Sequence, residues 1–177
     1  MGKEFSRVYQ FKITLKGVRP PIWRRIQVPE FYTFWDLHVA IQDAMGWLDY
    51  HLHEFEIIKP STGLEVNIGI PDDDFGREVL SGWKTKIAKY FSMRNRLSSY
   101  TYDFGDNWEH AVRLEKILPR DENMGYPRCI AGRRACPPED CGGVWGYERL
   151  HEIINDPESD EYEETLEWVG GIFEPEH

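Results

Sequence analysis

Apolar and polar residues alternate through the first stretch of the chain. Over residues 7–16 the polar side chains occupy one face, and the other face carries the apolar residues Tyr9, Phe11, Ile13 and Leu15. This period of two predicts a half-buried strand. A second such segment, Ile22 to Val28, follows the break at Arg19-Pro20-Pro21. The two segments together predict an opening β-hairpin.

The apolar spacing then changes to that of a helix. Thr33 and Asp36 have the spacing of a capping box. After Thr33, apolar residues recur at helical intervals until Gly46, at Phe34, Leu37, Ile41, Ala44 and Met45. We therefore predict a central helix that begins after Thr33 and ends at Gly46.

Alternation returns over residues 51–58, which predicts a strand with His51, His53, Phe55 and Ile57 on one face. The segment from Lys59 to Gly82 is rich in turn residues and contains a short strand near Val66 to Ile70. Apolar residues between Trp83 and Arg94 indicate a short helix, and residues 99–117 predict a second hairpin.

The C-terminal part follows the loop of residues 126–143. It contains a helix that ends near Pro157 and an acidic helix that Gly170 and Gly171 close. The sequence thus predicts one α+β domain over residues 1–177, with an acidic helical part from about residue 144. Its mainly antiparallel sheet of about five or six strands is packed by the central helix and the two C-terminal helices.

The register of the second hairpin determines which of its side chains meet. A three-residue loop at Gly105-Asp106-Asn107 pairs Phe104 with Trp108, Tyr102 with His110, and Tyr100 with Val112. A two- or four-residue loop would instead place Asp103 opposite His110. We favour the three-residue loop because it joins apolar and aromatic partners. Asp103 and Glu109 would then be opposed on the outer face.

Charge and overall hydrophobicity restrict the function classes. The net charge is -10, but residues 150–177 hold ten acidic residues and neither lysine nor arginine, so 21 acids and 21 bases remain in residues 1–149. A neutral body argues against a large nucleic-acid footprint. The chain has no apolar run of 18 residues and no apolar segment of a signal peptide at its start. We therefore expect a soluble cytoplasmic protein with no membrane partner.

Histidines and cysteines form the candidate metal site. His51 and His53 could offer two ligands from one strand, His110 a third and Cys136, or else Cys141, a fourth, a set suited to zinc. The spacing of Cys129, Cys136 and Cys141 matches no zinc-finger pattern, and an odd cysteine count favours free thiols over a disulfide framework. Buried, hydrogen-bonded histidines beside the core are the alternative.

A thiol offers a second chemistry. Cys136 with His110 is the one nucleophile and base pair that we consider, with Arg133 and Arg134 favouring the thiolate. The chain contains no P-loop, G-x-S-x-G or H-E-x-x-H motif. The loop of residues 133–143 could hold an anion through its arginines, or it could lock the C-terminal helices in place.

Four motifs carry a resemblance to a known family. They are Tyr9-Gln10-Phe11-Lys12-Ile13-Thr14-Leu15 with Pro21-Ile22-Trp23-Arg24-Arg25, His51-Leu52-His53-Glu54-Phe55, the segment from Tyr102 to His110, and the segment from Ala135 to Gly143. Over residues 5–173 the chain resembles the plasmid pRiA-type ORF-three-like family. The resemblance implies a compact α+β domain of plasmid or insertion-element type without an established activity.

Three functions follow as hypotheses. The first is a non-enzymatic accessory domain that binds a ligand, a protein or a nucleic acid. Its candidate face consists of His51, His53, Tyr102, Asp103, Asp106, Trp108, His110, Arg133, Arg134, Cys136, Glu139 and Asp140. The second is a metal- or thiol-dependent hydrolase built on His51, His53, His110 and Cys136. The third is a regulatory module that binds a protein partner through its acidic C-terminal helices.

Overall fold

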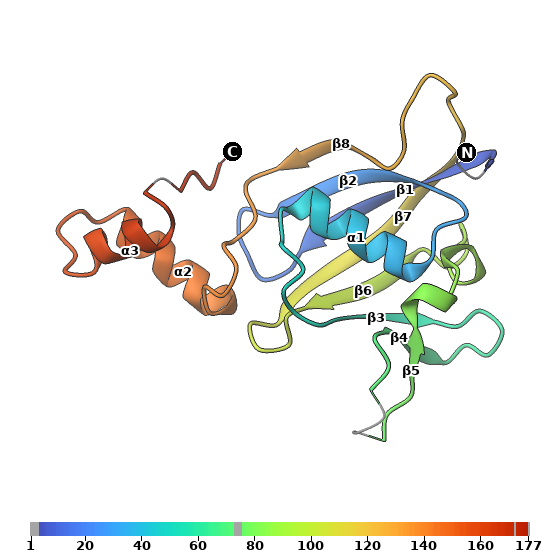
Figure 1. The fold of residues 1–177 in the computed structure, drawn as a ribbon, viewed down its shortest axis with the longest axis horizontal. Coiled ribbons are helices and arrows are strands. Elements are labelled where there is room, and N and C mark those ends of the chain that lie inside the picture. Colours follow the sequence, from blue (N-terminus) through green and yellow to red (C-terminus); the bar gives the residue numbers. More distant parts are fainter. Residues whose placement is uncertain (1–3, 73–75, 172, 177) are drawn as a thin grey trace.

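The computed structural model describes residues 4–72, 76–171 and 173–176, which form a single eight-stranded sheet with helices on one face and at one end (Figure 1). Over these residues the strand order is β5-β4-β3-β6-β7-β1-β2-β8, and only the β4 and β5 pair is parallel. The α+β class is confirmed. The strands are β1 (Arg7–Leu15), β2 (Ile22–Pro29), β3 (His53–Ile58), β4 (Glu65–Gly69), β5 (Val79–Ser81), β6 (Leu97–Tyr102), β7 (Trp108–Pro119) and β8 (Arg128–Arg133).

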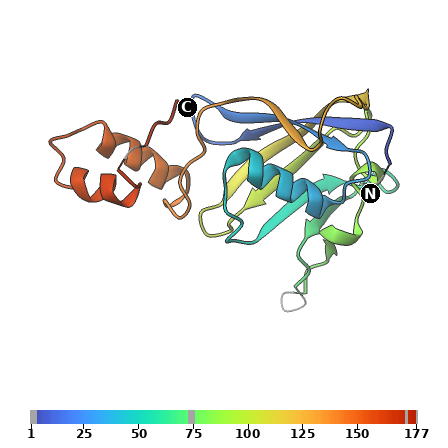
Figure 2. The ribbon, with the colours of Figure 1, turned by 45° about the horizontal axis from the view of Figure 1, so that its top comes forward.

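The opening hairpin forms as predicted. β1 and β2 pair in antiparallel register from Val8 opposite Pro29 to Leu15 opposite Ile22. The alternating apolar residues of β1 are buried, since one side of the sheet packs under the helix (Figure 2).

The central helix α1 (Phe34–Met45) also forms as predicted. The backbone N–H of Asp36 donates to the Thr33 hydroxyl at 3.1 Å, and the Asp36 carboxylate accepts from the Thr33 N–H at 2.9 Å. Gly46 ends the helix with a φ of 93°, a left-handed conformation that glycine adopts without strain. The helix lies across one face of the sheet and buries two polar side chains, His38 and Gln42, beside its apolar ones.

The predicted number of five or six strands is wrong because both edges of the sheet carry a short extra strand. β5 has three residues, too few for an alternating pattern. β8 is largely exposed and pairs with β2 through its backbone, so its sequence shows no apolar face. The short helix predicted between residues 83 and 94 is replaced by two 3-10 turns, η2 (Gly82–Lys84) and η3 (Ile87–Lys89).

Both registers considered for the second hairpin are wrong. Tyr102 pairs with Trp108 and Tyr100 with His110, so the turn consists of the five residues 103–107. Asp103 and Asn107 bound this turn with φ values of 58°, a left-handed conformation that Asp and Asn tolerate better than most residues. The pairing keeps Tyr102, Trp108 and His110 buried, as predicted, but Phe104 is half exposed. Glu109 faces Thr101, not Asp103.

Two helices form beyond one end of the sheet (Figure 1). The first, α2 (Gly143–Ile154), buries Tyr147, Leu150 and Ile153. The acidic α3 (Tyr162–Trp168) has no buried residue and is closed by Gly170 and Gly171, both at positive φ. Within the part of the chain that the structure describes, no helix combines the length and the apolar character needed to cross a bilayer.

Candidate functional site

The turn between β6 and β7 presents a fixed carboxylate. Asp103 Oδ1 accepts hydrogen bonds from the backbone N–H groups of Gly105 at 3.0 Å and Asp106 at 3.3 Å. The Asp103 N–H in turn donates to the carbonyl of Leu52 at 2.9 Å, which ties the turn to the segment before β3. The second oxygen of Asp103 is left to face that segment.

Two further carboxylates come from the loop before α2. Glu139 accepts from the Leu48 N–H at 2.7 Å and from the Tyr102 hydroxyl at 3.0 Å. Asp140 follows with a φ of 57°. Burial, and then the neighbouring Glu139 carboxylate, raise the pKa of Tyr102 well above its usual range, so its hydroxyl remains a donor at neutral pH.

Glycines bring this loop against the turn. The N–H of Gly142 donates to the Asp106 carboxylate at 3.2 Å. A Cβ on Gly143 would lie 2.5 Å from the backbone oxygen of Asp106, and one on Gly146 would lie 1.8 Å from that of Cys141. The loop therefore lies directly against the turn at Gly143, where a side chain would collide with the backbone.

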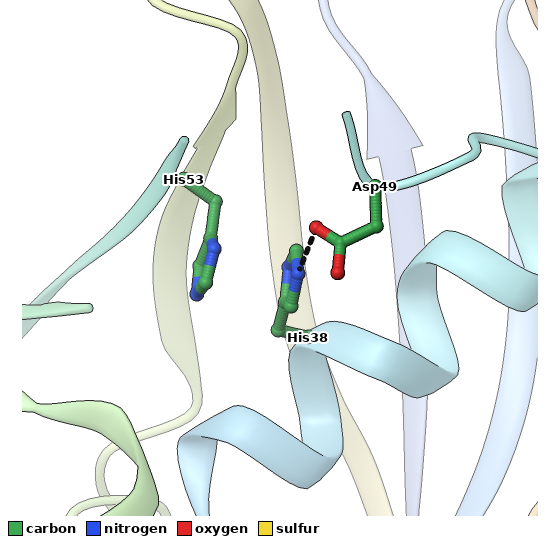
Figure 3. Close-up of side chains that lie close together, drawn as sticks. All are labelled: His38, Asp49 and His53. Carbon is green, nitrogen blue, oxygen red and sulfur yellow. Dashed lines mark hydrogen bonds and ion pairs between the residues drawn. The ribbon is translucent and has the colours of Figure 1, made fainter. Parts of the chain in front are cut away.

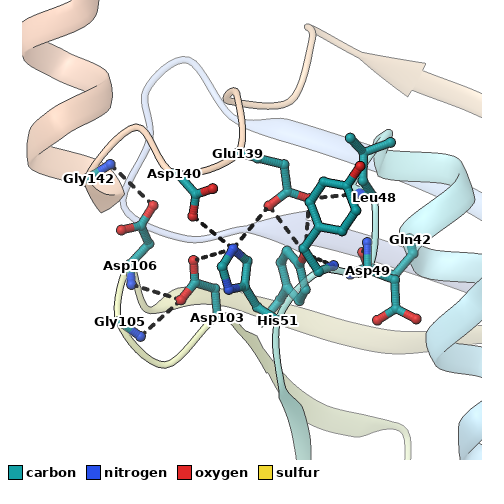
Figure 4. A network of polar contacts seen from close by, with 12 residues as sticks. Gln42, Leu48, Asp49, His51, Asp103, Gly105, Asp106, Glu139, Asp140 and Gly142 are labelled. Carbon is teal, nitrogen blue, oxygen red and sulfur yellow. Dashed lines mark hydrogen bonds and ion pairs between the residues drawn. The ribbon is translucent and has the colours of Figure 1, made fainter.

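His51 lies where these carboxylates converge (Figure 4). Its Nε2 is 2.8 Å from Asp140 Oδ1, 3.5 Å from Asp103 Oδ2 and 3.9 Å from Glu139 Oε2. The nitrogen is buried, yet it makes no hydrogen bond of acceptable geometry. Among the residues described here, no lysine or arginine pairs with any of the three carboxylates. We call His51, Asp103, Glu139 and Asp140 the carboxylate cluster.

A separate group of polar side chains lies beneath α1 (Figure 3). His38 Nε2 is 2.8 Å from Asp49 Oδ1, and its Nδ1 is 2.7 Å from the hydroxyl of Tyr100. The ring of His53 stacks on that of His38 with centroids 3.4 Å apart and planes at 7°. Burial lowers the pKa of His38 to about 4 and that of His53 to about 3, so both are neutral at physiological pH. We call His38, Asp49 and His53 the histidine pair site.

The four predicted metal ligands do not form one set. Among the described residues, the groups with metal-ligand spacing are His51 with Asp103 and Asp140, and His38 with Asp49 and His53, so His51 and His53 belong to different groups. The strand predicted from residue 51 begins only at His53, so the two histidines do not share a strand face. His110 is fully buried, with its Nδ1 3.2 Å from the carbonyl of Tyr100.

The structure does not support the predicted activation of the Cys136 thiol. Burial raises the pKa of Cys136 to about 11, and the cation that opposes this rise is Arg24, not Arg133 or Arg134. Arg134 instead donates to the carbonyl of Pro20 at 2.5 Å and to Glu176 at 3.1 Å. All three cysteines are free, in accord with their odd number. Trp108 belongs to the core, and Arg133 ends β8.

Two residues of the histidine pair site were missed from sequence. His38 lies on the apolar stripe of α1, where a polar residue is unusual, and that position is a signal that could have identified it. Asp49 lies in the loop after the helix with a φ of 56°, and the sequence pattern carries no comparable signal for it.

Comparison with known proteins agrees with the four motifs. The chain is similar to the uncharacterised protein y4hQ of Sinorhizobium fredii, with 36% identity over 166 residues, covering 93% of this chain and 82% of that protein. It is also similar to the crystal structure of MM3350, a protein of unknown function from Methanosarcina mazei Go1. The TM-score is 0.92 and the identity 55%, covering 98% of this chain and 96% of the other. With a match from residue 7 to residue 177, the chain belongs to the plasmid pRiA4b ORF-3-like protein family.

Proposed function

We propose that this protein is a binding domain whose functional centre is a divalent metal ion held by the carboxylate cluster. The observation that carries the proposal is the position of His51 Nε2, buried without a hydrogen bond and surrounded by three carboxylates at 2.8, 3.5 and 3.9 Å. The donor atoms of His51, Asp103 and Asp140 all lie within 4.8 Å of one another, and carboxylates this close disfavour one another unless a cation lies between them. A divalent ion would supply that charge.

The spacing of the donors suits one ion. Metal–nitrogen and metal–oxygen bonds of roughly 2.0–2.2 Å place two ligands of the same ion about 3 Å apart. His51 with Asp140 and His51 with Asp103, at 2.8 and 3.5 Å, are close to this separation. Glu139 is farther away and is already held by Leu48 and Tyr102, so we assign it to supporting charge and not to direct ligation.

The donor types suggest which ions bind. One imidazole with two carboxylates is intermediate between the oxygen sites of Mg²⁺ or Ca²⁺ and the nitrogen and sulfur sites of zinc fingers. Mn²⁺ and Zn²⁺ accept such a mixture. The Asp140 side chain is 63% exposed, so the remaining coordination positions would face solvent, where an anionic group of a ligand can complete the shell. The ion would thus bind the anionic group of the ligand directly.

Titration with Mn²⁺ tests the proposal, because Mn²⁺ has little affinity for thiols and reports the carboxylate cluster and not Cys129. The protein is first stripped with a chelator, and bound Mn²⁺ is measured from the loss of the free-ion electron paramagnetic resonance signal. We expect one ion per chain. Asp103→Asn and Asp140→Asn should each weaken binding at least about tenfold, since each removes a charged ligand.

Glu109→Gln is the matched control. This carboxylate belongs to the same hairpin but is exposed, and within the described residues its one side-chain hydrogen bond comes from the Asn107 amide at 3.3 Å. The control should bind Mn²⁺ as the parent protein does. Absence of stoichiometric binding, or equal weakening by all three substitutions, would show that the cluster is an ordinary acidic surface.

A further inference from the structure

His53 is a buried histidine without a hydrogen-bond partner. It is 2% exposed, and neither Nδ1 nor Nε2 has a hydrogen-bond partner in the described part of the protein. An unsatisfied buried polar group costs about 1–3 kcal/mol, and such groups are few in native proteins. A bound ion is one of the arrangements that satisfies them. The groups around the His53 ring therefore decide whether it could bind an ion.

Two further potential ligands surround His53. His38 comes from α1, Asp49 from the loop after it, and His53 from the start of β3 (Figure 3). One donor atom from each residue lies within 4.8 Å of the other two. Two imidazoles and one carboxylate form a set that borderline transition metals favour.

We infer that the histidine pair site is a second metal site, which binds a borderline transition-metal ion such as Zn²⁺ or Co²⁺ through His38, Asp49 and His53. The inference does not depend on the carboxylate cluster. It rests on residues outside that cluster and on softer donors, so the two sites should prefer different ions.

Two of the three donor atoms already have the separation expected of two ligands of one ion. His38 Nε2 and Asp49 Oδ1 are 2.8 Å apart, close to the separation of about 3 Å between two ligands of one ion. An imidazole binds a metal in the plane of its ring, whereas the rings of His38 and His53 are stacked at 7°. Binding therefore requires the ring of His53 to turn. Among the described residues no hydrogen bond opposes this rotation, and the torsion is intrinsically broad.

Groups around the site can orient its ligands. A histidine that binds metal through one nitrogen usually donates its other N–H to an oxygen, and the Tyr100 hydroxyl lies 2.7 Å from His38 Nδ1. Gln42 fixes this arrangement, because its amide donates to the same hydroxyl at 2.9 Å and accepts from the Asp49 N–H at 3.0 Å. Asp49 is 39% exposed and offers a path for the ion from solvent.

Co²⁺ binding tests the inference, with the visible absorption of the bound ion and elemental analysis as readouts. The parent for this experiment carries Asp140→Asn, which weakens the carboxylate cluster, and Cys129→Ser, which removes the exposed thiol. We expect one Co²⁺ per chain, displaced by Zn²⁺. His53→Leu should weaken Co²⁺ binding at least about tenfold without loss of stability in the metal-free protein, because the replaced ring has no hydrogen bond to any residue that the structure describes.

His151→Gln is the control, since this half-buried histidine lies on α2 and contacts Tyr147. It should leave Co²⁺ binding unchanged. The inference is overturned if no stoichiometric Co²⁺ is bound or if the His53→Leu protein binds it as the parent does. Failure of the Mn²⁺ experiment with success here would retain the histidine pair site alone, and the converse would retain only the carboxylate cluster.

Discussion

The Tyr102→Phe substitution removes one oxygen atom from the support of the carboxylate cluster. That oxygen donates to Glu139 at 3.0 Å and accepts the N–H of Tyr50 at 3.1 Å. A hydrogen bond to a charged group contributes about 1.5–3 kcal/mol, and a partly buried N–H left without its acceptor costs about 1 kcal/mol. Because the phenyl ring preserves the packing, we expect the free energy of unfolding to fall by about 2–4 kcal/mol.

Urea unfolding followed by tryptophan fluorescence measures this change, with an unaltered dependence on urea as the sign that the unfolded state is comparable. Tyr50→Phe is the matched control, because its side chain is 70% exposed and its hydroxyl has no hydrogen bond among the described residues. The control should change stability by less than about 0.5 kcal/mol. An equally small effect of Tyr102→Phe would refute the proposed support of Glu139.

Three further predictions concern pH, packing and thiol chemistry. Folding holds the pKa values of three histidines near 3 to 4, below their unfolded value of 6.5, so the stability from their neutral forms is complete above pH 6.5. The free energy of unfolding, measured by urea titration, should therefore fall as the pH drops toward 4. The three histidines responsible are His38, His53 and His110. Gly143→Ala should destabilise the protein by about 2–4 kcal/mol in thermal unfolding, through strain at positive φ and a backbone clash, whereas Gly125→Ala meets no neighbouring atom and should be neutral. At neutral pH a thiol reagent should modify exposed Cys129 well before partly buried Cys136, whose thiol pKa is raised, and Cys129→Ser should abolish the fast phase.

Local sequence patterns were sufficient to predict the elements whose structure is determined by neighbouring residues. The capping box at Thr33, the alternation in β1 and the glycines after α3 each involve residues within a few positions of one another, and each prediction is confirmed. The inward face of the second hairpin was also predicted, since side-chain alternation survives a shift of register by two residues. The turn length was not, because the left-handed conformations at Asp103 and Asn107 are stabilised by contacts outside the turn as well as within it.

The candidate sites depended on contacts between distant segments. Asp103, Glu139 and Asp140 were all candidates from sequence, yet only folding placed their carboxylates around His51 and left His110 and Cys136 in other surroundings. Folding likewise brought His38 and Asp49 into the histidine pair site. Periodicity reports which face of an element is buried, so the sequence alone determined most of the helices and strands. Its four motifs determined the family. The close approach of loops depends on packing across the whole fold, and therefore only the tertiary structure decided which polar side chains meet.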